Sequence, residues 1–355
     1  MIRSRPALSI LSVAILGSAH AADLIPLAPV STEYTRVQVA DWIDGSSFAM
    51  GRWDGSLGIF HVGAKPTFAL TLVQSFVSSG GDGVEMVGSL DQHTLIFSDN
   101  ASQLGILIRT ANEPFGAPTM VPYDSAYGVA NSVTSLRDGG VDLVVTGHAN
   151  GFALVWARSS GKLTLLRTID LKSANPIPSP YPLKNIRGLA PWRNGMVISG
   201  SEDGDLVAFD ARTGKLLFRQ RYSPIAERGI NGISLAGDKL LVVNCAVGSK
   251  DRNLWLYKVG EEGFSLLDSV NLVRDVTRKQ VFDFDVDAFD ASGKTRFVSS
   301  TEEGLIWSGS VVSDKIQVDG VGEVSNNGAA SLDVNPANGS ILAGSQDLLI
   351  FPPLQ

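Results

Sequence analysis

The densest run of chemically active side chains in this sequence is an alternation of aspartates, "DFDVDAFDASG", which begins at Asp283. Hard cations such as Ca²⁺ take several carboxylate oxygens, so alternating aspartates resemble half of a calcium loop. The run has Ala288 where such a loop needs glycine and Lys294 where it needs a bidentate glutamate. Asp283, Asp285 and Asp287 are therefore only weak metal candidates. Side chains two residues apart share one face of a strand, and we interpret these three as a solvated face.

Other catalytic residue types are few and scattered. Beyond the first 21 residues the histidines are His61, His93 and His148, and their spacing suggests neither a zinc site nor a Ser-His-Asp arrangement. The single cysteine, Cys245, lies in the apolar run "KLLVVNCAV", which predicts a small buried side chain and not a reactive thiol. The sequence therefore predicts neither a metal nor a cofactor, and it gives an enzymatic role little support.

Two long, proline-rich segments carry tyrosine, a residue type that anchors many protein interfaces. The first, "ANEPFGAPTMVPYDSAYG", contains Tyr123 and Tyr127, and the second, "KSANPIPSPYPLKN", contains Tyr181. Alternating prolines favour an extended, stiff backbone that loses little entropy on binding. We predict that the three tyrosines bind a partner. The alternative is that both segments merely cap the fold.

A second set of candidates shares one position in three similar apolar runs. Aligning "ANSV", "IRGL" and "INGI" makes Asn131, Arg187 and Asn231 equivalent. If these runs are the inner strands of a ring, the three side chains lie near the mouth of its channel. Arg228 and Arg274 add positive charge from neighbouring loops, and a partly basic rim suits an acidic segment of a partner. Ordinary surface solvation explains the same residues equally well.

Short strands in a repeated order must position these side chains. The stretch "ISGSEDGDLVAFDARTGKLLF", from Ile198, contains two strands around an Asp-Gly turn and the start of a third strand. Six similar stretches recur roughly every 45 residues, the period of four-stranded propeller blades. They begin at Ser47, His93, Leu143, Lys239, Thr295 and Gly339. No window shows a sustained helical period. The spacing predicts a single all-β, seven-bladed propeller.

The last repeat is incomplete, because the chain ends at Gln355 after three strands. We expect the segment from Asp23 to Arg36 to supply the fourth strand, since pairing the two ends in one blade removes an exposed sheet edge. Eight blades and a β-sandwich are the alternatives. The length barely permits the first, and the second does not explain the period.

The N-terminus has the pattern of a secretory signal. Arg3 and Arg5 precede a short apolar run and then small residues, which predicts a signal peptide over residues 1–21 with cleavage after Ala21. The apolar run is too short to span a bilayer. Residues 22–355 would then form an exported propeller, periplasmic or secreted. The formal net charge of −7 argues against sequence-independent nucleic-acid binding, which needs a basic face.

The stretch "GSEDGDLVAFDARTGKLLF" and its weaker echo "GHANGFALVWARSSGKLTLL" resemble blades of the WD-repeat and quinoprotein-dehydrogenase-like propeller superfamily. The Gly-His dipeptide of WD repeats is missing, His148 falls in a different turn, and Trp-Asp occurs only at Trp53 and Asp54. The histidine–serine–tryptophan–aspartate network of that family is therefore not expected here. The quinone-dependent members are longer and carry a vicinal disulfide, so one cysteine implies no quinone cofactor.

Two functional hypotheses follow. The resemblance is nearest in kind to bacterial periplasmic propellers that act as assembly scaffolds, which implies a monomer that binds another cell-envelope protein through its inter-blade loops. The alternative is a propeller enzyme or a small-molecule or sugar binder, similar to lactonases, with its site at the channel mouth. A deep pocket holding several carboxylates would favour the alternative. The scattered catalytic residue types favour the scaffold.

Overall fold

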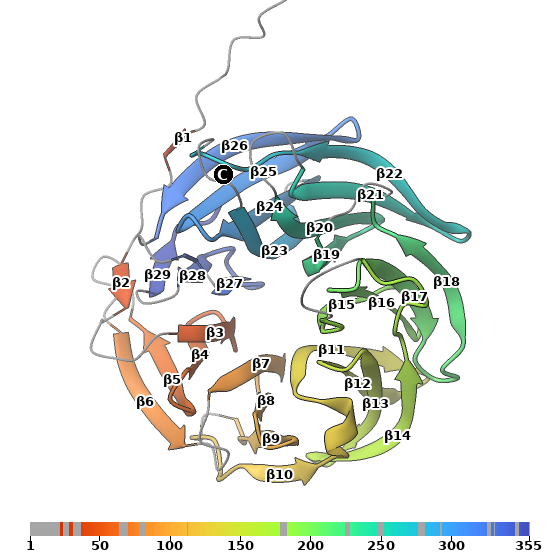
Figure 1. Cartoon of the computed structure of the whole chain (residues 1–355). Helices are drawn as coiled ribbons and strands as arrows, with labels where there is room; N and C mark the ends of the chain where they lie inside the picture. Colours follow the sequence, from red (N-terminus) through yellow and green to blue (C-terminus); the bar gives the residue numbers. More distant parts are fainter. Residues whose placement is uncertain are drawn as a thin grey trace, which may run out of the picture.

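Strands account for almost all of the regular structure in this protein, a computed structural model of which is shown in Figure 1. The structure describes residues 22–23, 28–30, 37–63, 70–77, 83–111, 113–177, 183–223, 228–246, 252–275, 281–291, 293–324, 328–329, 331–344 and 348–354. Among them the one helix is a 3-10 turn, η1 (Ser125–Tyr127). No helix in these ranges is long and apolar enough to cross a membrane.

The described strands form seven antiparallel blades arranged in a ring, each with four strands, which confirms the predicted propeller (Figure 1). Blade 1 contains β3 (Val37–Trp42), β4 (Ser47–Arg52), β5 (Ser56–Val62) and β6 (Leu70–Val77). Blade 2 contains β7 (Val84–Asp91), β8 (Thr94–Asp99), β9 (Gln103–Ile108) and β10 (Thr119–Pro122). Blade 3 contains β11 (Ala130–Asp138), β12 (Val141–His148), β13 (Phe152–Ser159) and β14 (Lys162–Asp170).

Blades 4 to 6 continue the order. Blade 4 contains β15 (Ile186–Pro191), β16 (Met196–Ser201), β17 (Asp205–Asp210) and β18 (Leu216–Arg221). Blade 5 contains β19 (Ile230–Ala236), β20 (Lys239–Ala246), β21 (Leu254–Gly260) and β22 (Gly263–Val270). Blade 6 contains β23 (Val281–Ala291), β24 (Lys294–Thr301), β25 (Leu305–Val312) and β26 (Lys315–Glu323). A short pairing of β20 with β23 joins blades 5 and 6 at Cys245 and Phe282. The side chain of Cys245 is outside the described part.

Blade 7 closes the ring with strands from both ends of the chain. It contains β27 (Ser331–Val334), β28 (Ile341–Gly344) and β29 (Leu348–Phe351), and β2 (Ala28–Val30) pairs antiparallel with β29. The predicted closure by the N-terminal segment is thus confirmed. The preceding β1 (Ala22–Asp23) pairs in parallel with β26 of blade 6.

Apolar residues between neighbouring blades hold the ring together. The described core divides into seven clusters, one at each blade–blade interface, and the seam between blades 7 and 1 packs Leu342 and Ile350 against Phe48. Burial of apolar area at these interfaces is the main stabilising contribution, since the structure has no disulfide to add to it. The Gly turns predicted between second and third strands also form: Gly151 and Gly204 have φ of 79° and 92°, which glycine adopts without strain.

Candidate functional site

A β-bulge near the start of each inner strand sets the geometry of one channel mouth. In blades 1 to 6 one residue of the inner strand is left unpaired with the second strand. The bulged residues of blades 3, 4 and 5 are Asn131, Arg187 and Asn231, so the predicted equivalence of these three residues is confirmed. A bulge turns its side chain away from the regular pleat. Asn131 and Arg187 line a cavity of about 360 Å³ in the channel.

Hydrogen bonds connect the bulged residues of blades 3 and 4 into a polar rim. Asn131 Nδ2 donates to Asn185 Oδ1 (3.2 Å), and Asn185 Nδ2 donates to Glu202 Oε2 (2.6 Å). Arg187 Nε donates to the other carboxylate oxygen of Glu202 (2.9 Å). The rim on this side is therefore mixed in charge and less basic than the sequence suggests. The Tyr222 hydroxyl donates a hydrogen bond to the backbone carbonyl oxygen of the half-buried Arg228 (2.7 Å).

The predicted tyrosines occupy different surroundings from those expected of exposed anchors. The Tyr123 hydroxyl accepts the Ala130 N–H (3.2 Å), and its ring meets the edge of His148. Tyr127 packs edge-on against Phe152. Both rings are partly buried against the apolar cluster between blades 2 and 3, so they mainly fix this loop. Tyr181 lies outside the described residues, and a partner-binding role for these tyrosines stays a prediction.

Blade 3 contains a buried hydrogen-bonded relay of a tryptophan, a threonine and a histidine that the sequence analysis did not predict. Trp156 Nε1–H donates to Thr146 Oγ1 (3.0 Å), and Thr146 Oγ1 lies 2.8 Å from His148 Nε2. His148 Nδ1 lies 3.0 Å from the carbonyl oxygen of Gly128, which only accepts, so Nδ1 carries the proton. His148 is the last residue of the second strand, β12, and the relay contains no aspartate, so it differs from the network of WD repeats. Burial lowers the pKa of His148 to about 4.

Four of the inner strands also carry an acceptor side chain that bonds to the next blade, and in blades 1, 5 and 6 it is the third residue after the bulge. Asp41 accepts the Ser89 N–H of blade 2 (2.5 Å). Asp333 of blade 7 accepts the Trp42 N–H of blade 1 (2.6 Å), and Asp287 of blade 6 accepts the Val334 N–H of blade 7 (2.9 Å). In blade 5 the Ser234 hydroxyl accepts the Ala288 N–H (2.8 Å). These side chains link four neighbouring pairs of inner strands, from blade 5 through blades 6, 7 and 1 to blade 2.

The interpretation of Asp283, Asp285 and Asp287 as an outward, solvated strand face is therefore wrong for the two whose side chains are described. Asp285 and Asp287 point into the central channel, because β23 is an inner strand, and both line the same channel cavity. The Asp283 side chain is outside the described part. Within that part no group of three or more Asp, Glu, His or Cys residues could hold a metal ion.

Burial raises the pKa of four channel carboxyls, and the charges of neighbouring carboxyls add to the shift for three of them. Burial raises the pKa of Asp41 to about 7 and that of Asp287 to about 6, and hydrogen bonds to Asp333 oppose both shifts. Burial and the charge of Asp287 raise the pKa of Asp285 to about 8. Burial and the charges of Asp41 and Asp287 hold the pKa of Asp333 well above its usual range. The carboxyls thus share protons near neutral pH, as coupled groups do.

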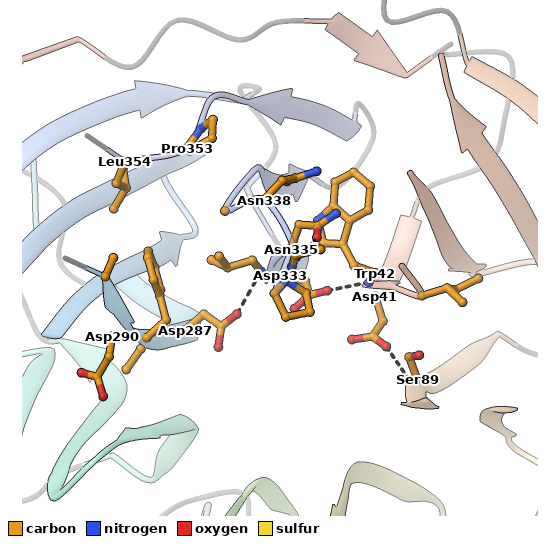
Figure 2. Close-up of a pocket in the computed structure, with 18 of the residues that line it drawn as sticks. Asp41, Trp42, Ser89, Asp287, Asp290, Asp333, Asn335, Asn338, Pro353 and Leu354 are labelled. Atoms are coloured by element: carbon orange, nitrogen blue, oxygen red, sulfur yellow. Dashed lines mark hydrogen bonds between the residues drawn. The ribbon is translucent and has the colours of Figure 1, made fainter. Parts of the chain in front are cut away.

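The larger cavity lies at the opposite channel mouth, away from the bulges. It measures about 990 Å³ and is bounded by the C-terminal ends of β3, β23 and β27 together with the turns that follow them (Figure 2). Asp41, Asp287 and Asp333 form its floor, and Asp290 lies at its edge (Figure 2). A deep pocket that holds several carboxylates is the feature that would favour a small-molecule binder over a scaffold. The structure therefore contains a site that the loop-based prediction missed.

Sequence reasoning missed Asp41 and Asp333. Asp41, Asp287 and Asp333 occupy the same position in three inner strands, as their matching bonds to the next blade show. The alignment that made Asn131, Arg187 and Asn231 equivalent covers blades 3 to 5, and none of the three aspartates lies in those blades. The spacing of the aspartates along the chain gives no indication that they lie together in the fold.

Comparison with known structures gives the fold a counterpart. The chain is similar to the WD40 beta propeller domain of Doa1, with a TM-score of 0.67 and 16% sequence identity over 94% of this chain and 98% of that one. No protein-family model matches the chain, and no curated protein matches its sequence. A likeness at this identity concerns the fold alone. The chain therefore has the seven-bladed propeller fold that WD40 domains adopt.

Proposed function

We propose that this protein is an exported scaffold that binds another cell-envelope protein through its inter-blade loop face, where the bulges lie. The observation that carries the proposal is the polar rim at this mouth, in which Asn131, Asn185, Glu202 and Arg187 form one hydrogen-bonded chain across blades 3 and 4. Loops on a rigid ring can vary without disturbing the blades, so they commonly carry binding residues.

Exposed apolar side chains on the same face support the proposal. Trp53 lies in the β4–β5 turn beside Gly83, which precedes the inner strand of blade 2, and its side chain is 54% exposed. Leu183, just before β15, is 52% exposed. Tryptophan, tyrosine and arginine dominate the energetics of many interfaces. Trp53 and Arg187 together therefore make a better pair of anchors than the packed tyrosines of the β10–β11 loop.

The test is capture of a partner from the periplasmic fraction by crosslinking, with identification by mass spectrometry. Trp53→Ala combined with Arg187→Ala should leave the protein folded and reduce recovery of a specific partner more than tenfold, since each anchor contributes about 2 kcal/mol. Val141→Ala combined with Val312→Ala is the matched control, because both valines are exposed in turns on the opposite face. Equal recovery by the loop-face variant and the control would reject the loop face as the binding surface.

A second candidate function, small-molecule binding at the channel mouth, is favoured by one specific observation, the 990 Å³ cavity with its carboxylate floor. Pockets of this volume are typical of ligand sites. The two functions use opposite mouths of the channel, so the loop-face variant does not affect the second.

A further inference from the structure

The cavity at the mouth opposite the bulges is lined by acidic side chains, and its described lining has no basic side chain. Its described lining includes five aspartates and no lysine, arginine or histidine; the aspartates are Asp41, Asp91, Asp287, Asp290 and Asp333. Asp91 is neutralised from outside the cavity by Arg158, at 2.5 Å. Among the described residues no cation forms an ion pair with a carboxyl of the floor. A ligand in this cavity therefore meets a field that attracts positive charge and repels anions.

One donor in the wall of the same cavity is unsatisfied. Trp42 is only 4% exposed, and its indole N–H has no hydrogen-bond partner among the described residues. Its ring lies in the cavity wall beside Asn335 and Asn338 (Figure 2). Both amides are engaged elsewhere, with their Nδ2 atoms donating to the carbonyls of Asp44 and Gly45. A buried N–H without an acceptor is costly, and a ligand oxygen would satisfy it.

The floor keeps acceptor capacity after its structural bonds are counted. Asp41 and Asp333 each accept one backbone N–H through Oδ2. Each carboxylate can accept several hydrogen bonds, so oxygen lone pairs remain available toward the cavity. No ion pair with Asp41, Asp287 or Asp333 occurs among the described residues, and burial raises the pKa of Asp41 to about 7 and that of Asp287 to about 6. An ammonium group would supply both the missing charge and the missing donors.

We propose that this cavity binds a small ammonium compound that also carries hydroxyl groups, of the amino-sugar or amino-alcohol class. The ammonium group lies on the floor formed by Asp41, Asp287 and Asp333, and a hydroxyl oxygen accepts the Trp42 indole N–H. Apolar side chains, Phe289 and Pro353 among them, contact the carbon skeleton. The site lies at the other mouth from the proposed partner face and does not depend on it.

Two other ligand classes fit the cavity less well. A bare divalent cation needs several acids at coordinating geometry, and no described group of residues provides it. An anionic or neutral sugar could use Trp42 but would leave the carboxyls without a counter-charge. The combination of an acidic floor and an unsatisfied donor is what selects a cation with an acceptor oxygen.

Titration calorimetry at about pH 6.5 with three probes separates the requirement for a positive charge from the requirement for hydroxyl groups. Glucosamine carries the charge and the hydroxyls, glucose lacks the charge, and cyclohexylamine lacks the hydroxyls. Glucosamine should bind at least tenfold more tightly than glucose and severalfold more tightly than cyclohexylamine. Binding should also release protons, measured by repeating the titration in buffers of different ionisation enthalpy, because an ammonium group lowers the pKa of the carboxyls beside it.

Three variants locate the effect. Asp333→Asn keeps an acceptor for the Trp42 backbone N–H and should weaken glucosamine binding at least tenfold, with less proton release and no change for glucose. Trp42→Phe removes the indole N–H and should weaken glucosamine binding about threefold without affecting cyclohexylamine. Asp170→Asn, at an exposed aspartate paired with Lys172 outside the channel, is the matched control and should change nothing.

The outcomes decide the proposal. Failure of glucosamine to bind at about 10 mM would overturn it, as would equal affinity for glucose and glucosamine. Unchanged glucosamine binding by the folded Asp333→Asn variant would place the ligand elsewhere and overturn the site. The calorimetric signature of proton release guards against a purely structural effect, because a change in packing alone would not alter it.

Discussion

Acidification should remove the contribution that one buried imidazole, that of His148, makes to the stability of this propeller. The side chain is fully buried, with Thr146 Oγ1 on one nitrogen and the Gly128 carbonyl on the other. Burial disfavours the charged form and lowers the folded pKa to about 4. An unfolded histidine titrates near 6.5, so the unfolded chain binds more protons between these values. The contribution of His148 is present above about pH 6.5 and is lost as the pH falls toward 4.

The magnitude follows from linkage. With a folded pKa of about 4 and an unfolded pKa of about 6.5, lowering the pH from 7 to 5 removes about 2 kcal/mol of unfolding free energy through this group. The channel carboxyls act in the opposite sense. Their folded pKa values lie above the unfolded value, so they destabilise the fold as the pH rises through 4 to 8. The wild-type pH profile alone therefore mixes two opposed effects.

A variant isolates the histidine. His148→Gln keeps a donor and an acceptor but does not titrate. Urea unfolding of both proteins at pH 7 and pH 5 gives two free-energy differences, and the advantage of the wild type over the variant should shrink by about 2 kcal/mol at pH 5. The carboxyls cancel because they are common to both proteins. An advantage that stays constant between the two pH values would show that His148 is not held neutral in the relay.

Three further predictions concern the channel, the seam and the N-terminus. Burial raises the pKa of Asp285 to about 8 and penalises its charged form. Asp285→Asn should therefore raise the unfolding free energy by about 1–2 kcal/mol at pH 8, a figure that allows for water in the channel. At pH 4 the substitution should leave the unfolding free energy unchanged. Deleting residues 23–36 should lower the melting temperature sharply in a thermal scan, because it exposes the edge of β29; an unchanged melting temperature would reject the closure. If the proposed signal peptide is cleaved, N-terminal sequencing of the protein from the periplasmic fraction should begin at Ala22, and an intact Met1 there would reject cleavage.

The repeat period was sufficient to predict the fold, because each blade carries its own turn and strand signals within roughly 45 residues. The equivalence of Asn131, Arg187 and Asn231 followed from the same repetition, since the bulge recurs at one position in each inner strand. Local patterns of this kind are visible in a sequence. They do not show which way a bulged or channel-facing side chain meets its neighbours.

The carboxylate floor could not be seen in the same way, because ring closure creates it. Asp333 bonds the Trp42 N–H across 291 residues of sequence, and each inner strand contributes only one or two of the acids. Nothing near Asp41 or Asp333 in the sequence marks either of them. The sequence also could not show how the tyrosines of the proline-rich segment pack, because Tyr123 and Tyr127 contact an apolar cluster that two blades, 2 and 3, form together.

Placing acids at this seam couples the channel to the closure of the ring. Asp333 joins blade 7 to blade 1, where the chain ends meet, and Asp287 joins blade 6 to blade 7. The residues that hold the seam also repel one another, so the seam is weakened as the carboxyls lose protons. A cation that binds only the folded ring reverses this, since it stabilises the state to which it binds and removes the repulsion. The stabilising effect of such a ligand should therefore grow as the pH rises from 5 to 7, which a purely apolar ligand of the same cavity would not produce.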